Sequence, residues 1–210
     1  DNPVRAILDQ GVAQIPAPVS AVSLVMDHGE LAHMAIGPLA ESWRSAVAES
    51  ARRNVRRTGR AYQRVLSCAP AMYEDLWTGG KCMYKLESIV ADGGELINAP
   101  HVTETSVTHG RVIERIGYHV RDYFLRHWDQ FNDVPRTVMA YCALVKGAGA
   151  YDNGVETPRI RVSFASGIGR AACERLNIGY VDPATIRVEE WENRENEGVL
   201  CVRKSGEVLY

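Results

Sequence analysis

The sequence predicts an α/β fold: a three-layer, Rossmann-like domain with a mainly parallel sheet and a hairpin at its C-terminal end. Two observations support this prediction. Short apolar segments alternate along the chain with segments in which apolar residues recur at helical spacing. No internal repeat or low-complexity tract interrupts this alternation. Alternating strands and helices imply βαβ units, whose crossover helices cover both faces of a mainly parallel sheet.

The composition is that of a soluble globular protein. The chain has 210 residues, which suits one domain with a substantial core, and 46% of them are hydrophobic. We expect a lead-in helix and linker over residues 1–18 and a single α/β domain over residues 19–210. The net charge of −2 argues against nucleic acid or an anionic membrane as a partner.

No feature of the sequence directs the chain to a membrane or to an oxidising compartment. The longest apolar runs, such as residues 19–26, are too short to span a bilayer. The first ten residues lack the basic and then apolar layout of a signal peptide. Five cysteines are scattered without a CxxC motif, which indicates free thiols in a reducing compartment. We therefore expect a cytoplasmic protein.

After the lead-in helix and linker, a β-hairpin and a helix are expected. Residues 20–27 and 31–36 have strand-like patterns and flank a tight turn at His28–Gly29. Pro38 stands where the first turn of a helix tolerates proline. Apolar residues then recur at helical spacing over residues 39–51.

The remaining elements follow from the same patterns, with Gly117 as the joint between two helical segments. The predicted strands are residues 62–67, 95–99, 137–145 and 159–165, and the predicted helices are residues 74–90, 111–131 and 168–176. The last twelve residues, VLCVRKSGEVLY, predict a hairpin around Ser205–Gly206.

Two glycine clusters come near the fingerprint of a dinucleotide site, which is GxGxxG between a strand and a helix. GAGAYDNG (147–154) lacks the third glycine, because Asp152 stands at that position. SGIG (166–169) does lie between a predicted strand and a predicted helix, so its amides could hold a phosphate. A plain turn is the favoured interpretation of both clusters.

The loop that follows the strand at residues 95–99 carries several polar side chains. His101, Glu104 and His109 lie at the carboxyl end of that strand, where ligands bind in open α/β sheets. They could bind a metal or act as acid and base, or they could belong to a self-hydrogen-bonded polar loop. Since no pair has the helical i, i+4 spacing, we predict no metal site in this chain.

Lys81 is the charged residue with the clearest functional interpretation. It directly follows Gly79–Gly80, early in the predicted helix 74–90, near the carboxyl edge of the sheet. Its ammonium offers three donors and a full charge to a substrate carboxylate. Each glycine costs about 1 kcal/mol of helix stability relative to alanine, which indicates that something approaches the backbone closely. The alternative interpretation is a solvated helix lysine.

Long segments of the chain resemble the C-terminal half of lactate racemase-like proteins, the nickel-pincer-dependent 2-hydroxyacid racemases and epimerases and their uncharacterised relatives. The similarity runs from about residue 19 to residue 186. The segments that carry it are AMYEDLWTGGKCMYKLESIVADGGELINAPHVTETSVTHGRVIERIGYHVRDYFLRHW, KGAGAYDNGVETPRIRVSFASGIG and LNIGYVDPATI.

The resemblance implies two α/β domains that face each other across a cleft, one of which binds the cofactor and the other the substrate. An N-terminal cofactor-binding domain, absent from this sequence, would hold the nickel-pincer nucleotide, and this chain would hold no cofactor. The C-terminal domain of the family binds the substrate carboxylate through a glutamine and, three residues later, a lysine. Lys81 matches that lysine, whereas Thr78 stands in place of the glutamine.

The sequence therefore favours the C-terminal substrate-binding domain of a 2-hydroxyacid racemase or epimerase, an isomerase that is inactive as an isolated domain. A small 2-hydroxy acid would bind to Lys81 and Thr78. Other side chains would line the cleft: Asp75, Trp77, His101, Glu104 and His109. One competing hypothesis is a non-catalytic α/β binding or assembly module, and another is a nucleotide-binding oxidoreductase that uses SGIG.

Overall fold

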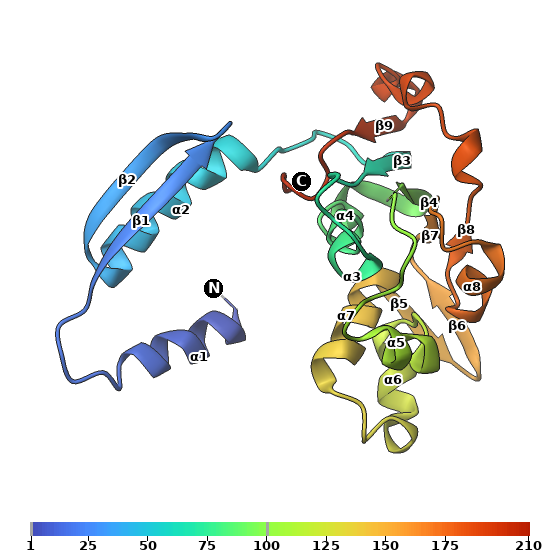
Figure 1. The fold of residues 1–210 in the computed structure, drawn as a ribbon, viewed down its shortest axis with the longest axis horizontal. Helices are drawn as coiled ribbons and strands as arrows, with labels where there is room; N and C mark the ends of the chain where they lie inside the picture. Colours follow the sequence, from blue (N-terminus) through green and yellow to red (C-terminus); the bar gives the residue numbers. More distant parts are fainter. Residues whose placement is uncertain (1, 100) are drawn as a thin grey trace. The chain divides into compact units, whose positions relative to one another are not determined.

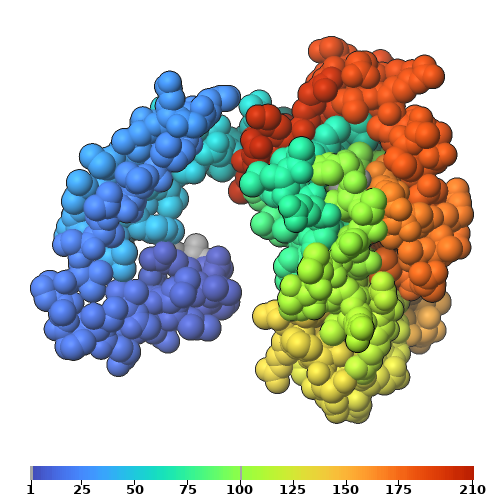
Figure 2. Space-filling model, in the orientation of Figure 1, coloured from blue at the N-terminus to red at the C-terminus, as the bar shows by residue number. Residues whose placement is uncertain are grey.

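The computed structural model describes residues 2–99 and 101–210. They form two compact units, Asp1–Val55 and Arg56–Tyr210. Figure 2 colours the first unit blue to cyan and the second from there to red. The chain thus divides at Val55, not after the expected linker at residue 18, because the first hairpin packs on the helix that follows it.

The first unit confirms the predicted hairpin and helix. Its elements are α1 (Pro3–Val12), β1 (Ser20–Asp27), β2 (Glu30–Pro38) and α2 (Leu39–Asn54). The two strands pair antiparallel. His28 and Gly29 both have positive φ angles, of 51° and 85°, as a two-residue type I′ turn requires. On the face that α2 covers, the buried Ser42 hydroxyl lies 2.8 Å from Ser23 Oγ and 2.9 Å from the Ala35 carbonyl oxygen.

The second unit is an α/β domain built on a five-stranded sheet (Figure 1). The strand order is β8-β7-β4-β3-β9, and every neighbouring pair is parallel. The strands are β3 (Tyr62–Cys68), β4 (Val90–Ala99), β7 (Arg161–Phe164), β8 (Gly179–Tyr180) and β9 (Val199–Val202). The predicted α/β class with a mainly parallel sheet is confirmed.

Helices and an antiparallel hairpin surround this sheet. The α-helices are α3 (Leu76–Gly79), α4 (Lys81–Tyr84), α5 (Gly110–Ile116), α6 (Arg121–Arg126), α7 (Arg136–Lys146) and α8 (Arg170–Arg175), and the hairpin is β5 (Gly149–Asp152) with β6 (Val155–Pro158). Short 3₁₀ helices are η1 (Glu87–Ile89), η2 (Trp128–Gln130), η3 (Pro183–Thr185), η4 (Val188–Trp191) and η5 (Glu195–Glu197).

The two faces of the sheet are covered differently. One face, with Val65 and Leu96, packs against the α-helices in the main hydrophobic core. The other, with Leu66 and Ile97, packs against the 3₁₀ segment around Trp191. The third layer of the domain therefore consists of 3₁₀ turns.

Two helix and strand predictions were wrong. Residues 137–145 form helix α7 instead of a strand, and its buried Val138, Tyr141, Cys142 and Val145 lie at helical spacing. Residues 74–90 do not form one helix. They divide into α3, α4 and η1, and β4 already begins at Val90, so the ADGG sequence lies within the strand.

The predicted C-terminal hairpin was also wrong. Residues 199–202 form β9, which pairs in parallel with β3, a strand far away in the sequence. The chain then turns back, so that the amide and hydroxyl of Ser205 both donate to the carbonyl oxygen of Cys68, over 3.2 and 2.9 Å. Lys85 Nζ donates to the Gly206 carbonyl oxygen over 2.5 Å. The C-terminal tail therefore closes one end of the sheet.

Candidate functional site

The strand order identifies where an open α/β sheet binds ligands. From β3 the chain proceeds outward on one side through β4, β7 and β8, and β9 then lies on the other side of β3. In parallel sheets, ligands bind at the carboxyl ends of the strands where the order reverses in this way. The segment after β3 leads into α3 and α4, which carry Thr78 and Lys81. Both residues thus follow the strand at this reversal.

Lys81 begins helix α4 and is partly buried. Its Nζ lies 5.5 Å from the centre of the Tyr73 ring, a cation–π distance. No carboxylate of residues 2–99 and 101–210 forms an ion pair with it within 4.0 Å. The ammonium is therefore held beside an aromatic ring while its charge stays available for an anion.

Asp75 organises the start of α3 and ties the 101–109 loop to it. Its side chain caps the helix, with Oδ1 accepting from the Thr78 amide over 3.0 Å. Its Oδ2 accepts from the Val107 amide over 3.3 Å, and the next residue, Leu76, donates its amide to the Glu104 carbonyl oxygen over 3.1 Å. Asp75 thus fixes the loop next to the helix that carries Thr78.

The Thr78 hydroxyl also turns toward Asp75. Its oxygen lies 3.0 Å from Asp75 Oδ1 and 3.1 Å from the Asp75 carbonyl oxygen, both of which are acceptors. A hydroxyl has one hydrogen, so it is used within this cap, and the two lone pairs of Thr78 can still accept. The short side chain therefore cannot donate to a ligand without leaving Asp75.

The glycine pair has a packing explanation. A Cβ at Gly80 would lie 2.5 Å from the Tyr141 hydroxyl and 2.7 Å from Val145 Cγ2, both on α7. The Gly79 carbonyl oxygen accepts from Asn98 Nδ2 over 3.0 Å. What approaches the backbone closely at Gly80 is helix α7, so Gly80 needs no ligand to explain it.

The other predicted cleft residues fall into separate contacts. The rings of Trp77 and His109 lie 4.5 Å apart, and Trp77 also packs on Tyr141 at 4.1 Å. His101 Nε2 lies 3.0 Å from the Ala71 carbonyl oxygen. Glu104 is exposed and contributes its backbone carbonyl. Within the described ranges, 2–99 and 101–210, no three His, Cys, Asp or Glu side chains are grouped to hold a metal ion.

SGIG (166–169) is a turn, as favoured from the sequence, whereas GAGAYDNG (147–154) is a turn only at its end, because Gly149–Asp152 form strand β5. Asn153 and Gly154, with φ angles of 50° and 81°, form the two-residue turn of the β5–β6 hairpin. In SGIG, the Gly167 amide donates to the Val102 carbonyl oxygen over 3.1 Å. A Cβ at Gly167 would lie 2.9 Å from Thr103 Cγ2. This amide and this glycine are thus used by the 101–109 loop, which does not favour a phosphate site.

One cluster of polar side chains, formed by His119, Glu156 and Asn177, was not predicted from the sequence. Glu156 accepts from the Val120 amide over 2.5 Å and from Asn177 Nδ2 over 2.8 Å, and its Oε2 lies 3.0 Å from His119 Nδ1. The His119 ring stacks on Tyr123 at 3.7 Å. These residues come from three segments that are far apart in the sequence, so no sequence spacing predicts the cluster.

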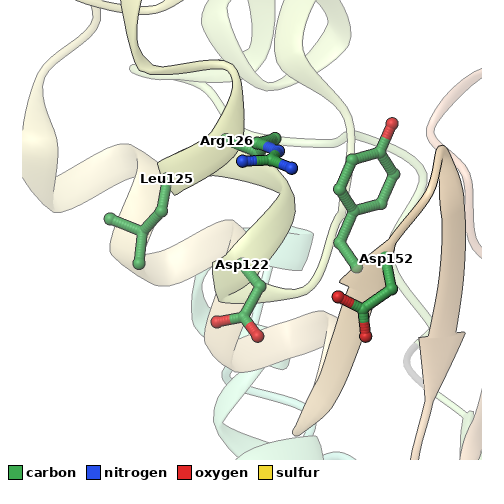
Figure 3. Close-up of a pocket in the computed structure, with 5 residues that line it drawn as sticks. Asp122, Leu125, Arg126 and Asp152 are labelled. Carbon is green, nitrogen blue, oxygen red and sulfur yellow. The ribbon is translucent and has the colours of Figure 1, made fainter.

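A shallow depression lies on the same side of the domain, between α6 and β5 (Figure 3). Asp122 and Asp152 reach toward one another across it, with Arg126 nearby. Leu125 and Tyr151 complete its lining. Since Arg121 already holds the Asp122 carboxylate over 3.1 Å, the depression has the character of a solvated rim.

None of the described helices has the length and hydrophobicity needed to cross a bilayer. No protein-family model matches the sequence, and no curated protein matches it. The crystal structure of a protein from Thermotoga maritima is similar to the whole chain, with a TM-score of 0.88 and 28% identity, and the match covers 54% of that protein.

A second solved structure that matches is the lactate racemase apoprotein from Thermoanaerobacterium thermosaccharolyticum. The match covers 90% of this chain and 45% of that one, with a TM-score of 0.58 and 10% identity. An identity this low supports a similarity of fold. The chain thus has a lactate racemase-like fold and spans about half the length of the solved structures that it matches.

Proposed function

We propose that this chain is the substrate-binding half of a 2-hydroxyacid racemase or epimerase. The observation that carries the proposal is the position of Lys81, a partly buried ammonium without a carboxylate partner among the described residues, on the segment that follows strand β3 at the reversal of the strand order. The similarity of the fold to the lactate racemase apoprotein supports the same function.

In this proposal the chain binds and orients the substrate. Lys81 attracts the carboxylate of the 2-hydroxy acid by charge and hydrogen bonding. Thr78 accepts a hydrogen bond from the substrate hydroxyl, because its own hydrogen is used by Asp75. The 101–109 loop, held in place by Asp75, contributes the wall of the cleft.

The chemistry at C2 belongs to the other half of the protein. The described residues offer no group of ligands for nickel, so they do not fit the metal of the nickel-pincer nucleotide. The cofactor and the acid and base would therefore reside on an N-terminal cofactor-binding domain. We expect the chain on its own to bind 2-hydroxy acids weakly and to convert none.

The test is Lys81→Ala in the longer protein, co-expressed with the enzymes that make the cofactor. Losing a hydrogen bond to a charged group costs about 1.5–3 kcal/mol, so kcat/KM for a 2-hydroxy acid should fall about ten- to hundred-fold. Lys204→Ala is the matched control, because Lys204 is an exposed lysine on the C-terminal tail. Unchanged kcat/KM in Lys81→Ala, or a longer protein that binds nickel and isomerises no 2-hydroxy acid, would refute the proposal.

A non-catalytic binding or assembly module remains the competing function. It is favoured by Thr78, which replaces the glutamine of the family and is turned into the helix cap. Such a module would bind a 2-hydroxy acid such as lactate through Lys81 without turnover in any form of the protein. Calorimetric titration with lactate, beside the activity assay, distinguishes the two functions.

A further inference from the structure

The β1–β2 hairpin has one open face that consists of apolar side chains. Three cross-strand pairs form it, and all six side chains are between 52% and 67% exposed: Val22 with Ile36, Leu24 with Met34, and Met26 with Leu31. We call these six residues the open sheet face. No charged side chain interrupts the three pairs, and a contiguous apolar patch of this kind marks an interaction surface.

The other face of the hairpin is already used. Helix α2 packs there, with Val25 and the hydrogen-bonded Ser42 between them. Helix α1 lies on the α2 side, where the Arg5 guanidinium sits 4.0 Å above the Trp43 ring. The residues of α1 that could cover apolar surface, such as Ile7, are themselves exposed. Within the first unit, the described residues therefore leave the open sheet face uncovered.

The first unit also lacks a core of its own. Of residues 2–55, only Val25 and Ser42 are buried. A two-stranded sheet with one covered face is marginal in water, and a unit of this size needs a substantial core to fold independently. The unit is therefore a fragment of a larger domain, whose remaining part must supply apolar side chains for the open sheet face.

We infer that the open sheet face docks the remaining half of the longer protein, which covers it with apolar side chains. The solved structures that match this chain carry additional polypeptide of similar size, since the match covers 54% and 45% of them. A second copy of this chain is a poorer occupant, because it would bring another unit without a core. The inference rests on the proposed function in one respect: the occupant is taken to be the remaining half of the longer protein.

Hydroxyl-radical footprinting with mass spectrometry tests the inference on this chain and on the longer protein. Met26 and Met34 report on the open sheet face, with 53% and 52% exposure. The buried Met139 gives the baseline, and the exposed Leu144, in the second unit, is the control. In the longer protein, oxidation of Met26 and Met34 should fall to the level of Met139, while this chain as a monomer should oxidise both readily.

Other outcomes overturn the inference. Met26 and Met34 exposed in the longer protein would show that nothing docks there. If Met26 and Met34 are protected in this chain alone, light scattering identifies what covers the face. A monomer would mean that α1 covers it, and a dimer would mean that a second copy covers it. A reading frame that encodes no further polypeptide would remove the occupant. If Met26 and Met34 are protected in a longer protein that has no racemase activity, this inference stands and only the proposed function is refuted.

A pair of variants provides an independent measurement. Leu24→Thr introduces a β-branched residue, which suits a strand, while removing apolar surface from the open sheet face. It should lower the Tm of the longer protein and leave the thermal unfolding of this chain unchanged. Leu144→Thr, at an exposed position in the second unit, gives the size of the change expected without docking. Equal shifts in the longer protein for both variants would contradict the inference.

Discussion

Replacing Glu156 by glutamine should destabilise the second unit at neutral pH and reduce its sensitivity to acid. The Glu156 side chain is only 15% exposed. Burial raises the pKa of this carboxyl, but hydrogen bonds from His119, the Val120 amide and Asn177 outweigh burial and hold the pKa at about 2. The usual value is 4.5. The charged form is therefore the one that the fold stabilises.

The size of the effect follows from linkage. Lowering the pKa from 4.5 to about 2 corresponds to at most about 3.5 kcal/mol, at about 1.4 kcal/mol per pH unit. Because the folded-state pKa is the lower one, this stabilisation is fully present above about pH 4.5 and is lost as the pH falls toward 2. Glutamine keeps an acceptor for the Val120 amide but places a donor opposite the Asn177 amide. We expect Glu156→Gln to cost about 2–3 kcal/mol at pH 7.

Urea unfolding followed by circular dichroism at pH 7, pH 5 and pH 3 measures this. The free energy of unfolding should fall from pH 5 to pH 3 more steeply for the wild type than for Glu156→Gln. Glu174→Gln is the matched control, because Glu174 is exposed on helix α8. If the wild type and Glu156→Gln have equal stability at pH 7, or the same slope at acid pH, the assignment of Glu156 as a stabilising buried carboxylate is wrong.

Two further predictions concern the segment that carries Lys81. Gly80→Ala should destabilise the fold by about 1–3 kcal/mol in thermal unfolding, because the new methyl group meets the Tyr141 hydroxyl, whereas Gly59→Ala, with nothing within 4 Å, should be neutral. Asp75→Ala should lower the free energy of unfolding by about 1–2 kcal/mol, because the cap of α3 is lost, and should raise hydrogen exchange in the 101–109 loop. Truncating the exposed Glu104 side chain should change neither the stability nor the hydrogen exchange. A stable Gly80→Ala variant, or a loop equally protected in Asp75→Ala, would contradict the packing described above.

The glycine pair before Lys81 shows how a correct sequence signal can have a different cause. Two glycines in a helical segment do indicate a close approach to the backbone, and the structure contains one. The approaching group is Tyr141 of α7, a segment predicted to be a strand. Because that helix was misassigned, the sequence offered no protein group to fill the space, and a ligand was the remaining explanation.

Short-range patterns alone determined much of the fold. The turns at His28–Gly29 and the joint at Gly117 were predicted because positive φ angles favour glycine and a few other residues, a property of the residue itself. The strands β3 and β7 were predicted because an apolar run between turn signals is also local information. The same holds for the position of Lys81 after β3, which needs only the order of elements along the chain.

Only the tertiary structure decided what depends on distant partners. Residues 137–145 are apolar enough for a strand or a helix, and packing against α4 and α5 made them helical. Residues 199–202 pair with β3 instead of with their neighbours, because a parallel strand finds its partner across the whole chain. His119, Glu156 and Asn177 meet for the same reason. Sequence spacing carries no record of such contacts, since the free energy that selects them comes from burying distant side chains together.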